Sequence, residues 1–425
     1  MKIYLDSVGC KLNQSEIERF GTQFRMAGHR LVASAEESDL LVINTCSVTS
    51  SAAADSRSKT RQAHRKNPEA QIVLTGCWST LAPSDASKMP GVQHVIDNRR
   101  KDRLVALVLD LDEEQFDREP LAREPIPGIR MRTRAFIKAQ DGCDNHCTFC
   151  LTTVARGSSR SIPLPRIVSE INSAVQGGAK EAVLTGVQLT GYGRDLEPKI
   201  DLRHLVLQLL SSTPIPRIRL SSLEPWKLPP NFYNLWEDRR MCRHLHLPLQ
   251  SGSAATLRRM ARPITPKRYA ALLDKARKWI PGLAVTTDII VGFPGETEAE
   301  FHESLAFIQK MNFAGAHVFI YSARAGTAAA TLATKVPAKI ARERSRRVRK
   351  AIEQSSNAYR NQFLGKTLNT LWESATAVGE NGWEVKGLTD NYLRVQATVP
   401  QNFWNHITPI RVISVGSNIL QGQLV

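Results

Sequence analysis

The chain has 425 residues, and its 57 Lys and Arg against 40 Asp and Glu give a formal net charge of +17. Hydrophobic residues make up 42% of it, which suffices for packed cores and excludes a disordered chain. The first residues read as a strand rather than a signal peptide, and we find no apolar run long enough to cross a membrane. We therefore expect a cytoplasmic protein with no membrane partner. The excess of positive charge favours a nucleic acid as partner over a merely well-solvated surface.

Residues 1–112 alternate predicted strands with predicted helices, which is typical of an open, parallel α/β sheet. The predicted strands are Lys2–Leu5, Leu40–Asn44, Ile72–Thr75 and Val92–Ile96, and the helices between them include Ser15–Met26 and Ala53–Lys66. Cys10, Cys46 and Cys77 follow the first three strands. Because ligands of such sheets collect outside the carboxyl ends of the strands, we expect these cysteines to share one site. Three unrelated buried thiols are the alternative.

A second alternation of strands and helices fills a central domain, residues 129–359, after a Pro- and Gly-containing linker at residues 111–132. The predicted strands are Ala135–Ala139, Ala182–Thr185, Ile218–Ser221, Arg243–Leu247, Ala284–Val291 and Ala316–Ile320. The predicted helices include Arg166–Gln176, Leu202–Leu210, Lys267–Trp279 and Glu298–Lys310. Six strand–helix units predict a partial (β/α)6 barrel with its active site at the carboxyl ends of the strands.

The most informative motif is the CxxxCxxC run of Cys143, Cys147 and Cys150, which follows the first strand of this predicted barrel. Three thiolates on one loop can hold three corners of a four-iron cluster and leave one iron open. A structural zinc site with His146 as a fourth ligand is the alternative. The chain has seven cysteines, and an odd number argues against a disulfide framework. We interpret the remaining one, Cys242, as an ordinary buried thiol.

The C-terminal part begins with a basic stretch, Pro337–Lys350, predicted to be helical, which is either a solvated face or a phosphate-binding helix. Residues 362–425 then alternate short strands and turns, such as Glu380-Asn381-Gly382, and predict a small β-barrel. The predicted strands are Thr367–Trp372, Trp383–Gly387, Leu393–Ala397 and Arg411–Val415. The predicted fold class of the whole chain is therefore α/β, with a small β-barrel at the end.

From end to end the chain resembles the radical S-adenosylmethionine methylthiotransferases. The matching motifs are Gly9-Cys10-Lys11-Leu12-Asn13-Gln14, Asn44-Thr45-Cys46-Ser47-Val48-Thr49, Thr75-Gly76-Cys77, the CxxxCxxC loop, Ala155-Arg156-Gly157, His246-Leu247-Pro248-Leu249-Gln250-Ser251-Gly252-Ser253 and Thr287-Asp288-Ile289-Ile290-Val291-Gly292-Phe293-Pro294-Gly295-Glu296-Thr297. The last segment resembles a TRAM module, an RNA-binding β-barrel. The motif starting at Gly9 and the run Gly387-Leu388-Thr389-Asp390-Asn391-Tyr392 look most like the branch that modifies threonylcarbamoyladenosine in tRNA.

The resemblance implies two 4Fe–4S clusters and S-adenosylmethionine as cofactors. Cys143, Cys147 and Cys150 would bind the cluster whose open iron chelates S-adenosylmethionine, and a radical made from this cofactor would activate the substrate. Cys10, Cys46 and Cys77 would bind an auxiliary cluster that carries the transferred sulfur. The implied reaction places a methylthio group on carbon 2 of threonylcarbamoyladenosine at position 37 of tRNA.

Nine further positions are candidate contacts of S-adenosylmethionine, and for each a turn or core-packing role is the alternative. They are Phe149, Thr185, Gly186, Val187, Ser222, Glu224, Gln250, Ile290 and Gly292. The expected partners are a tRNA anticodon stem-loop, gripped by the basic helix and the C-terminal barrel, and an unidentified reductant protein. Tyr392 and Trp383 either stack on bases or pack in the barrel core.

Three other hypotheses stay open at this point. The first keeps the chemistry and changes the substrate to isopentenyladenosine in tRNA. The second is a non-catalytic zinc-dependent RNA-binding protein. The third is a radical enzyme whose N-terminal cysteines are only structural.

Overall fold

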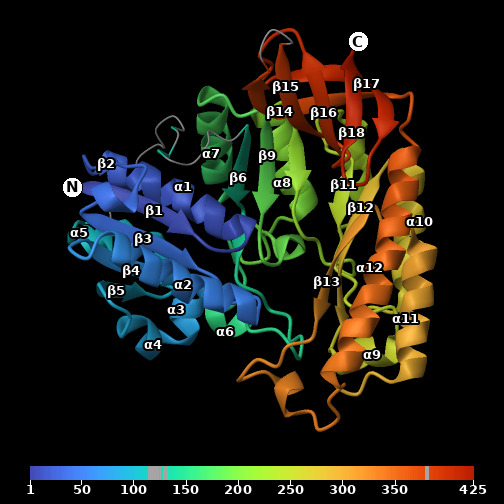
Figure 1. Ribbon diagram of the computed structural model, residues 1–425, viewed down its shortest axis with the longest axis horizontal. Coiled ribbons are helices and arrows are strands. Elements are labelled where there is room, and N and C mark those ends of the chain that lie inside the picture. The colour runs from blue at the N-terminus through green and yellow to red at the C-terminus, as the bar shows by residue number, and fades with distance from the viewer. Residues whose placement is uncertain (113–123, 125, 128–132, 379–381) are drawn as a thin grey trace.

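The computed structural model describes residues 1–112, 124, 126–127, 133–378 and 382–425, and these form three packed bodies (Figure 1). Most of the predicted linker and part of the turn at Glu380-Asn381-Gly382 lie outside the described residues. Ile126 lies within them, and its side chain is buried in the N-terminal core. No helix in these ranges is both long enough and apolar enough to cross a membrane.

The N-terminal body is a five-stranded parallel sheet with strand order β2-β1-β3-β4-β5. Its strands are β1 (Lys2–Ser7), β2 (Arg30–Leu31), β3 (Leu40–Thr45), β4 (Gln71–Gly76) and β5 (Val92–Ile96), and its helices are α1 (Lys11–Met26), α2 (Ser50–Lys66), α3 (Cys77–Leu81), α4 (Pro83–Ser87) and α5 (Leu104–Leu109). Separate hydrophobic clusters fill the two faces of the sheet, so all six residues of β3 are buried. The parallel α/β sheet is confirmed, and the two-residue β2 was not predicted because it is too short to show a periodicity.

Helix α1 begins four residues earlier than Ser15, the start that the sequence predicts. Its N-cap is Cys10, which has an extended backbone and makes no side-chain cap hydrogen bond. The usual capping residues Ser, Thr, Asp and Asn are absent at this position, which removes the signal that marks a helix start.

The central body is a half-barrel of six parallel strands. Its strands are β6 (Arg134–Lys138), β9 (Glu181–Thr185), β10 (Ile218–Leu220), β11 (His244–His246), β12 (Ala284–Val291) and β13 (Gly315–Ile320), and the short pair β7 (Gln140–Asp141) and β8 (Arg160–Ser161) lies beside them. The helices are α6 (Thr152–Arg156), α7 (Leu164–Gln176), α8 (Leu202–Ser212), α9 (Ala254–Arg259), α10 (Pro266–Trp279), α11 (Glu298–Met311) and α12 (Ala338–Asn361). Parallel bridges from Ile218 to Met241 and from Ser222 to His246 join the sheets β10-β9-β6 and β11-β12-β13. The predicted partial (β/α)6 barrel is confirmed.

The C-terminal body is a closed barrel with strand order β14-β15-β16-β18-β17 around the buried Trp372. Its strands are β14 (Thr367–Ala377), β15 (Trp383–Thr389), β16 (Arg394–Val399), β17 (Ile407–Val415) and β18 (Leu420–Leu424). The small barrel is confirmed, but the sequence predicts four strands. The fifth strand, β18, has two glutamines and a glycine among its five residues, so its alternation is too weak to mark a strand.

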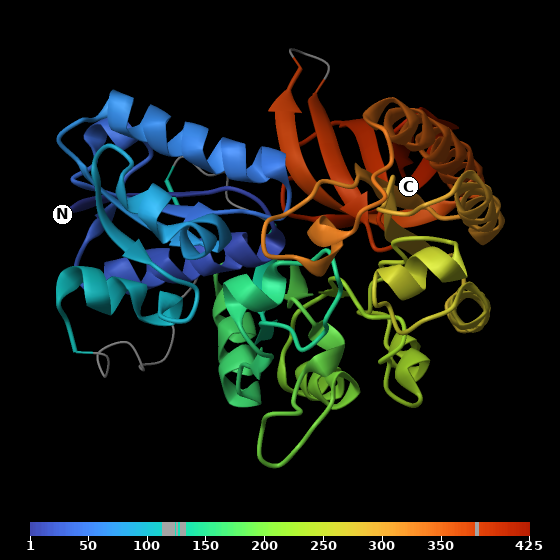
Figure 2. The same ribbon diagram turned by 90° about the horizontal axis from the view of Figure 1, so that it is seen from below.

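The C-terminal barrel and the carboxyl ends of the core strands lie at opposite ends of the half-barrel (Figure 1). Arg219 fastens the C-terminal barrel near the amino ends, where its guanidinium donates to the carbonyls of Thr389 at 3.1 Å and Asp390 at 3.0 Å. Helix α12 runs between the two ends of the half-barrel (Figure 1). The N-terminal sheet lies beside the half-barrel, with α1 packed on β6 (Figure 2).

Candidate active site

The three N-terminal cysteines lie at the carboxyl ends of neighbouring strands. Cys10 caps α1 after β1, Cys46 follows β3, and Cys77 begins α3 directly after β4. Because these strands are adjacent in the sheet, their ends bring the three thiols together. Burial raises the pKa of the Cys46 thiol, and the charges of Cys10 and Cys77 raise it further, since both are close enough to interact with it.

Two glycines allow the cysteine-bearing turns to approach so closely. Gly9 has φ +103°, and a Cβ there would lie 2.5 Å from the Sγ of Cys46. Gly76 has φ +100°, and a Cβ there would lie 2.2 Å from the carbonyl oxygen of Thr45. Both positions are open to glycine alone, because a side chain would be strained by its backbone and would also collide with a neighbour.

The CxxxCxxC loop lies at the carboxyl end of the first core strand and is fixed by backbone contacts. The Cys143 N–H donates to the Gly157 carbonyl at 3.0 Å, and the Thr148 N–H donates to the Met260 carbonyl at 3.1 Å. The Asp144 N–H donates to the side-chain oxygen of Gln188 at 2.8 Å. These bonds hold the loop in place without using the three thiols, so the thiols remain available as ligands.

Nitrogen donors point at four of the six sulfurs. The backbone N–H of Asn145 lies 3.4 Å from Cys143 Sγ, and that of Thr152 lies 3.4 Å from Cys150 Sγ. Side-chain nitrogens of Arg262 and Asn98 lie 3.7 Å from the sulfurs of Cys147 and Cys77, respectively. Donors of this kind stabilise thiolates and tune iron–sulfur clusters, so both sets of cysteines have the chemistry of cluster ligands.

Burial favours the neutral thiol in both sets. It raises the pKa of Cys143 to about 11, although the Asn145 N–H works in the opposite direction. Atoms packed around the sulfurs likewise raise the pKa of Cys10 and of Cys150, although both residues are exposed at the protein surface. These thiols therefore become thiolates at neutral pH when a metal supplies the compensating charge.

Among the described residues, no group of three or more His, Cys, Asp and Glu side chains has the arrangement of ligands around a single metal ion. Each thiolate of a four-iron cluster binds a separate iron, so its sulfurs stand farther apart than the ligands of one ion. The distances between ligand sulfurs around a four-iron cluster are thus longer than those around a single zinc ion, and the finding above concerns the shorter ones only.

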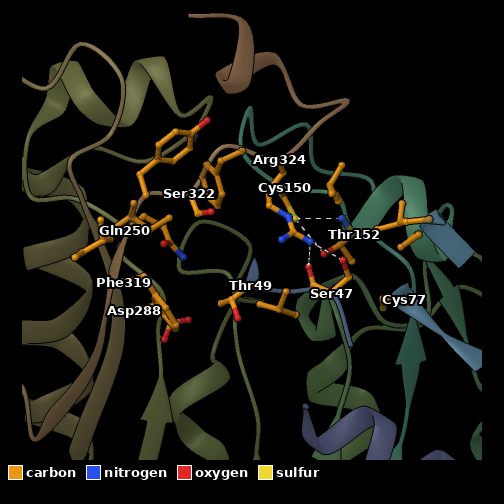
Figure 3. A pocket seen from close by; sticks show the side chains of 18 residues that line it. Ser47, Thr49, Cys77, Cys150, Thr152, Gln250, Asp288, Phe319, Ser322 and Arg324 are labelled. Carbon is orange, nitrogen blue, oxygen red and sulfur yellow. Dashed lines mark hydrogen bonds between the residues drawn. The ribbon is translucent and has the colours of Figure 1, made fainter. Parts of the chain in front are cut away.

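A cavity of about 250 Å³ lies between the N-terminal body and the core (Figure 3). One cysteine of each set lines it, namely Cys77 and Cys150. The lining also contains Ser47, Val48, Thr49, Leu81, Phe149, Leu151, Thr152, Ala155, Gln250, Asp288, Ile290, Phe319, Ile320, Tyr321, Ser322 and Arg324. The wall is mainly apolar with a few polar groups, which is typical of a pocket for an organic ligand.

The loop after β13 closes one side of the cavity against the N-terminal body. One nitrogen of Arg324, Nη2, donates to the Ser47 carbonyl at 2.7 Å and to the Ser47 hydroxyl at 2.5 Å, while Nη1 donates to the Ser50 hydroxyl at 3.3 Å (Figure 3). The hydroxyls of Ser50 and Ser322 lie 2.7 Å apart. Residues more than 270 positions apart in the chain thus form one wall.

A buried ion network joins the N-terminal body to the core, and the charge of its Arg156 interacts with Cys10 and Cys77. Its members are Glu16, Lys101, Lys138, Asp141 and Arg156. Arg156 donates to Glu16 at 3.0 Å, to Asp141 at 2.9 Å and to the side-chain oxygen of Asn13 at 2.9 Å. Burial by itself raises the pKa of Glu16, but the charges of Arg156, Lys101 and Lys138 outweigh it and hold that pKa well below its usual value.

Three of the nine predicted cofactor contacts line the cavity. They are Phe149, Gln250 and Ile290. Phe149 also packs edge-on against Phe293, with ring centroids 6.2 Å apart. Gln250 has φ +73° and forms a bridge to Ile289, so its side chain comes from the end of the barrel wall.

The other six predicted contacts are placed outside this lining. Thr185, Gly186 and Val187 end β9 and follow it, and the Thr185 hydroxyl donates to the Ile137 carbonyl at 3.0 Å. Ser222 lies in the bridge to β11. Glu224 is buried and accepts a hydrogen bond from Thr190, and burial raises its pKa. Gly292 packs against Ala341 of α12.

Sequence reasoning assigned no role to several residues of the site. Asp288, Phe319, Tyr321 and Arg324 line the cavity, and Arg156 holds the two bodies together. Asp288 and Arg156 stand inside the motifs that carry the resemblance, so a signal for them was present. Arg324 stands outside every motif, and only the fold brings it to the site.

The remaining predictions about single residues have clear outcomes. Cys242 is a buried thiol, as expected, with 1% of its surface exposed. Tyr392 stacks on His244 with ring centroids 4.1 Å apart and also lies against Arg219, so its ring is used where the C-terminal barrel meets the core. Trp383 is partly buried against the core of the C-terminal barrel.

Two family descriptions match the chain. Residues 2–97 match "Uncharacterized protein family UPF0004", and residues 137–308 match the radical SAM superfamily. The solved structure of the radical S-adenosylmethionine methyltransferase TsrM from Kitasatospora setae has a TM-score of 0.54 at 14% identity and covers 75% of this chain and 74% of that one. This likeness supports the fold. The half-barrel with its CxxxCxxC loop is thus that of a radical S-adenosylmethionine enzyme, which uses this cofactor and a 4Fe–4S cluster.

Curated relatives narrow the family. A threonylcarbamoyladenosine tRNA methylthiotransferase, MtaB, of Bacillus subtilis is 34% identical over 99% of this chain and 95% of its own. MtaB of Aquifex aeolicus is 32% identical over 93% and 96%, and a tRNA-2-methylthio-N(6)-dimethylallyladenosine synthase of Clostridium tetani is 29% identical over 99% and 96%. The chain belongs to the radical S-adenosylmethionine methylthiotransferases of the MtaB type. It is therefore a transferase rather than a non-catalytic zinc-dependent protein.

Proposed function

We propose that this enzyme places a methylthio group on carbon 2 of threonylcarbamoyladenosine at position 37 of tRNA. The observation that carries the proposal is the cavity between the two bodies, since it is lined by Cys77 from one set of cysteines and by Cys150 from the other. A reaction that needs a radical source and a sulfur source calls for two such centres on one chamber.

In this proposal Cys143, Cys147 and Cys150 hold the cluster that binds S-adenosylmethionine, and Cys10, Cys46 and Cys77 hold an auxiliary cluster. When bound, the clusters and the cofactor supply the radical chemistry and the sulfur that acid–base catalysis cannot provide at an unactivated C–H bond. The N–H donors on the sulfurs support thiolate ligands. The candidate cofactor contacts are the nine positions predicted from the sequence, of which Phe149, Gln250 and Ile290 line the cavity.

The protein's own residues shape the chamber and give it an apolar wall. The buried ion network fixes the N-terminal body on the core, so the two sets of cysteines keep a constant separation. Phe149, Ile290, Phe319 and Tyr321 give the wall an apolar surface. Excluding water protects a reactive intermediate from side reactions.

Helix α12 offers a path for the RNA backbone. Four basic residues line a surface groove of about 660 Å³ together with Ile320, Ser345 and one acid, Glu353; they are Arg342, Arg346, Arg349 and Lys350. Ile320 also lines the cavity, so the groove reaches the cavity wall. Phosphates on this helix would place an unstacked base of an anticodon stem-loop at the chamber.

The C-terminal barrel would extend the same grip on the RNA. It exposes the basic residues Lys366, Lys386, Arg394 and Arg411. A stem-loop spanning α12 and this barrel would contact both ends of the half-barrel. The proposal also needs an electron donor, an unidentified reductant protein, and it places the enzyme in the cytoplasm with its tRNA.

The test compares modified nucleosides of tRNA from cells with and without the gene. We expect the methylthio form of threonylcarbamoyladenosine to disappear on deletion and to return with the intact gene. Loss of the methylthio form of isopentenyladenosine instead would transfer the proposal to that substrate. Unchanged levels of both would overturn it.

A second test separates two clusters from one. The anaerobically purified enzyme should hold about eight irons per chain if both cubanes are present. The variant Cys46→Ala should lose about half of this iron and the methylthio product while keeping part of its S-adenosylmethionine cleavage. Retention of the product would mean that the N-terminal cysteines are structural.

A further inference from the structure

Arg324 gives the cavity a positive charge at one wall. It is the single Lys or Arg among the described residues that line the cavity, and it is half-buried on the loop after β13. Figure 3 shows its guanidinium directed at Ser47, to which dashed hydrogen bonds join it. All three of its hydrogen-bond partners in the described part of the chain are neutral oxygens. Asp288, the one acid among the lining residues, lies 3.2 Å from His246 Nε2, and no acid is among the hydrogen-bond partners of Arg324 in the described part of the chain.

The loop that carries Arg324 is fixed rather than free. The carbonyl of Arg324 accepts hydrogen bonds from the Thr327 N–H at 3.1 Å and the Thr327 hydroxyl at 2.8 Å. Further along, the Ala329 N–H donates to the carbonyl of Thr148 in the CxxxCxxC loop at 2.8 Å. The guanidinium is thus held in a defined position relative to the cysteines, as a group that recognises a ligand must be.

A guanidinium on an apolar wall is suited to an anionic ligand such as a carboxylate. Ser47 uses both N–H groups of Nη2 and Ser50 uses one of Nη1, so among the described contacts the second N–H of Nη1 and the N–H of Nε are left to donate to such a ligand. Two carboxylates would enter this cavity under the proposed function: that of the methionine part of S-adenosylmethionine and that of the threonyl side group on the target adenine. The first has a partner already, since it would chelate the open iron of the Cys143, Cys147 and Cys150 cluster. The second has none.

We propose that Arg324 binds the carboxylate of the threonylcarbamoyl group and so selects this nucleoside. The inference rests on the proposed function and adds to it a residue that decides between substrates. An isopentenyl group is uncharged, and burying it here would remove water from the guanidinium without giving it a new partner. The threonylcarbamoyl carboxylate would replace the lost water with a charged hydrogen bond, so the guanidinium favours binding of the acidic side group over the isopentenyl group.

The test measures RNA binding by the enzyme with its clusters but without S-adenosylmethionine, so that no turnover occurs. The probes are an anticodon stem-loop carrying threonylcarbamoyladenosine and the same RNA with its threonyl carboxylate methylated to an ester. The intact enzyme should bind the acid at least about tenfold more tightly than the ester, as expected for a charged hydrogen bond. Equal binding of acid and ester by the intact enzyme would overturn the inference, whatever any variant does.

Two substitutions at Arg324 separate charge from contact. Arg324→Gln keeps a donor for Ser47 but removes the charge, and it should reduce the preference for the acid to within about twofold. Arg324→Lys keeps the charge and should retain part of the preference. Arg268→Gln is the matched control, because it removes a guanidinium that is exposed on α10 and does not line the cavity. It should keep the full preference for the acid. A reduction as large as that of Arg324→Gln would mean that the overall charge of the protein sets the preference, and it would overturn the inference.

The dissociation constant of S-adenosylmethionine distinguishes the two carboxylates. We expect Arg324→Gln to leave it unchanged. A tenfold weakening there, with equal losses for both RNAs, would assign the guanidinium to the cofactor and overturn the inference. If the intact enzyme prefers the acid but modifies neither RNA when S-adenosylmethionine, a chemical reductant and inorganic sulfide are added, the proposed function fails and the assignment of Arg324 stands.

Discussion

The substitution Glu16→Gln tests the network that holds the two bodies together. The Glu16 carboxylate is 3% exposed, and it accepts hydrogen bonds from Lys101 at 2.6 Å, from Arg156 at 3.0 Å and from Asn44 at 2.9 Å. Replacing it by an amide leaves three buried cations with Asp141 as their one fully buried carboxylate in the network. Breaking a buried ion pair by removing one partner typically costs about 3–5 kcal/mol, so we expect a loss of that size in the free energy of unfolding.

The pH dependence gives the prediction a sign. The pKa of Glu16 is lowered in the folded state, so its contribution is present above the unfolded value and is lost as the pH falls through the folded value. Burial lowers the pKa of Lys101, while Glu16 raises it, so the variant should lower that pKa further. A lysine whose pKa is lowered on folding binds a proton more weakly in the folded state than in the unfolded state. It therefore lowers the free energy of unfolding at low pH, and this effect disappears when the pH rises above its unfolded pKa. The stability gap between variant and parent should therefore narrow as the pH rises toward the unfolded pKa of lysine, about 10.4.

The assay is denaturant unfolding under anaerobic conditions at several pH values, with cluster content matched between proteins. Glu37→Gln is the control, because Glu37 is an exposed acid on the same body, and it should change the stability by less than about 0.5 kcal/mol. A loss below about 1 kcal/mol for Glu16→Gln, or a gap that widens with pH, would refute the reasoning.

Three further changes follow from other contacts. Gly76→Ala puts a Cβ 2.2 Å from the Thr45 carbonyl oxygen in a backbone conformation that is nearly exclusive to glycine. We expect thermal unfolding to show a loss of at least about 1–3 kcal/mol in the free energy of unfolding, together with a lower iron content. An unchanged iron content would contradict this prediction. Arg219→Met removes the partner of the buried Glu181 carboxylate, so we expect the free energy of unfolding to fall by about 3–5 kcal/mol. Limited proteolysis should then cut the chain before the C-terminal barrel. Resistance equal to that of the wild type would show that Arg219 does not fasten this barrel. The double variant Arg346→Ala/Lys350→Ala should lower the slope of log affinity against log salt for the stem-loop by about 1.4–1.8; an unaltered slope would exclude α12 from the RNA path.

Much of the fold is readable from local patterns. The strands of the N-terminal sheet and of the half-barrel end within two residues of their predicted ends, with the exception of the two-residue β2, because long apolar runs between turn signals mark buried parallel strands. The placement of cysteines after successive strands also predicts that they meet, since parallel strands bring their carboxyl ends to one edge. The misses, β2, β7, β8 and β18, are short strands that neighbouring strands hold in place by pairing rather than by their own side-chain pattern.

The candidate site divides in the same way. Phe149, Gln250 and Ile290 stand in or beside motifs and line the cavity, while Gly186 and Gly292 directly follow strands yet lie outside its lining. Following a strand fixes the end of the barrel at which a residue lies, but the direction of its side chain depends on the turn it adopts. A sequence pattern does not contain that direction.

By itself the sequence determined the chemistry: two sets of three thiols, a half-barrel to present one of them, and a basic exterior suited to RNA. These properties reside in residue types and in short spacings, which local structure preserves. The tertiary structure alone decided what surrounds that chemistry, because the docking of one body on another depends on contacts between distant residues. The pairing of Arg156 with Glu16 across 140 positions and of Arg324 with Ser47 across 277 positions are such contacts. They shape the chamber, and no periodicity or motif spacing records them.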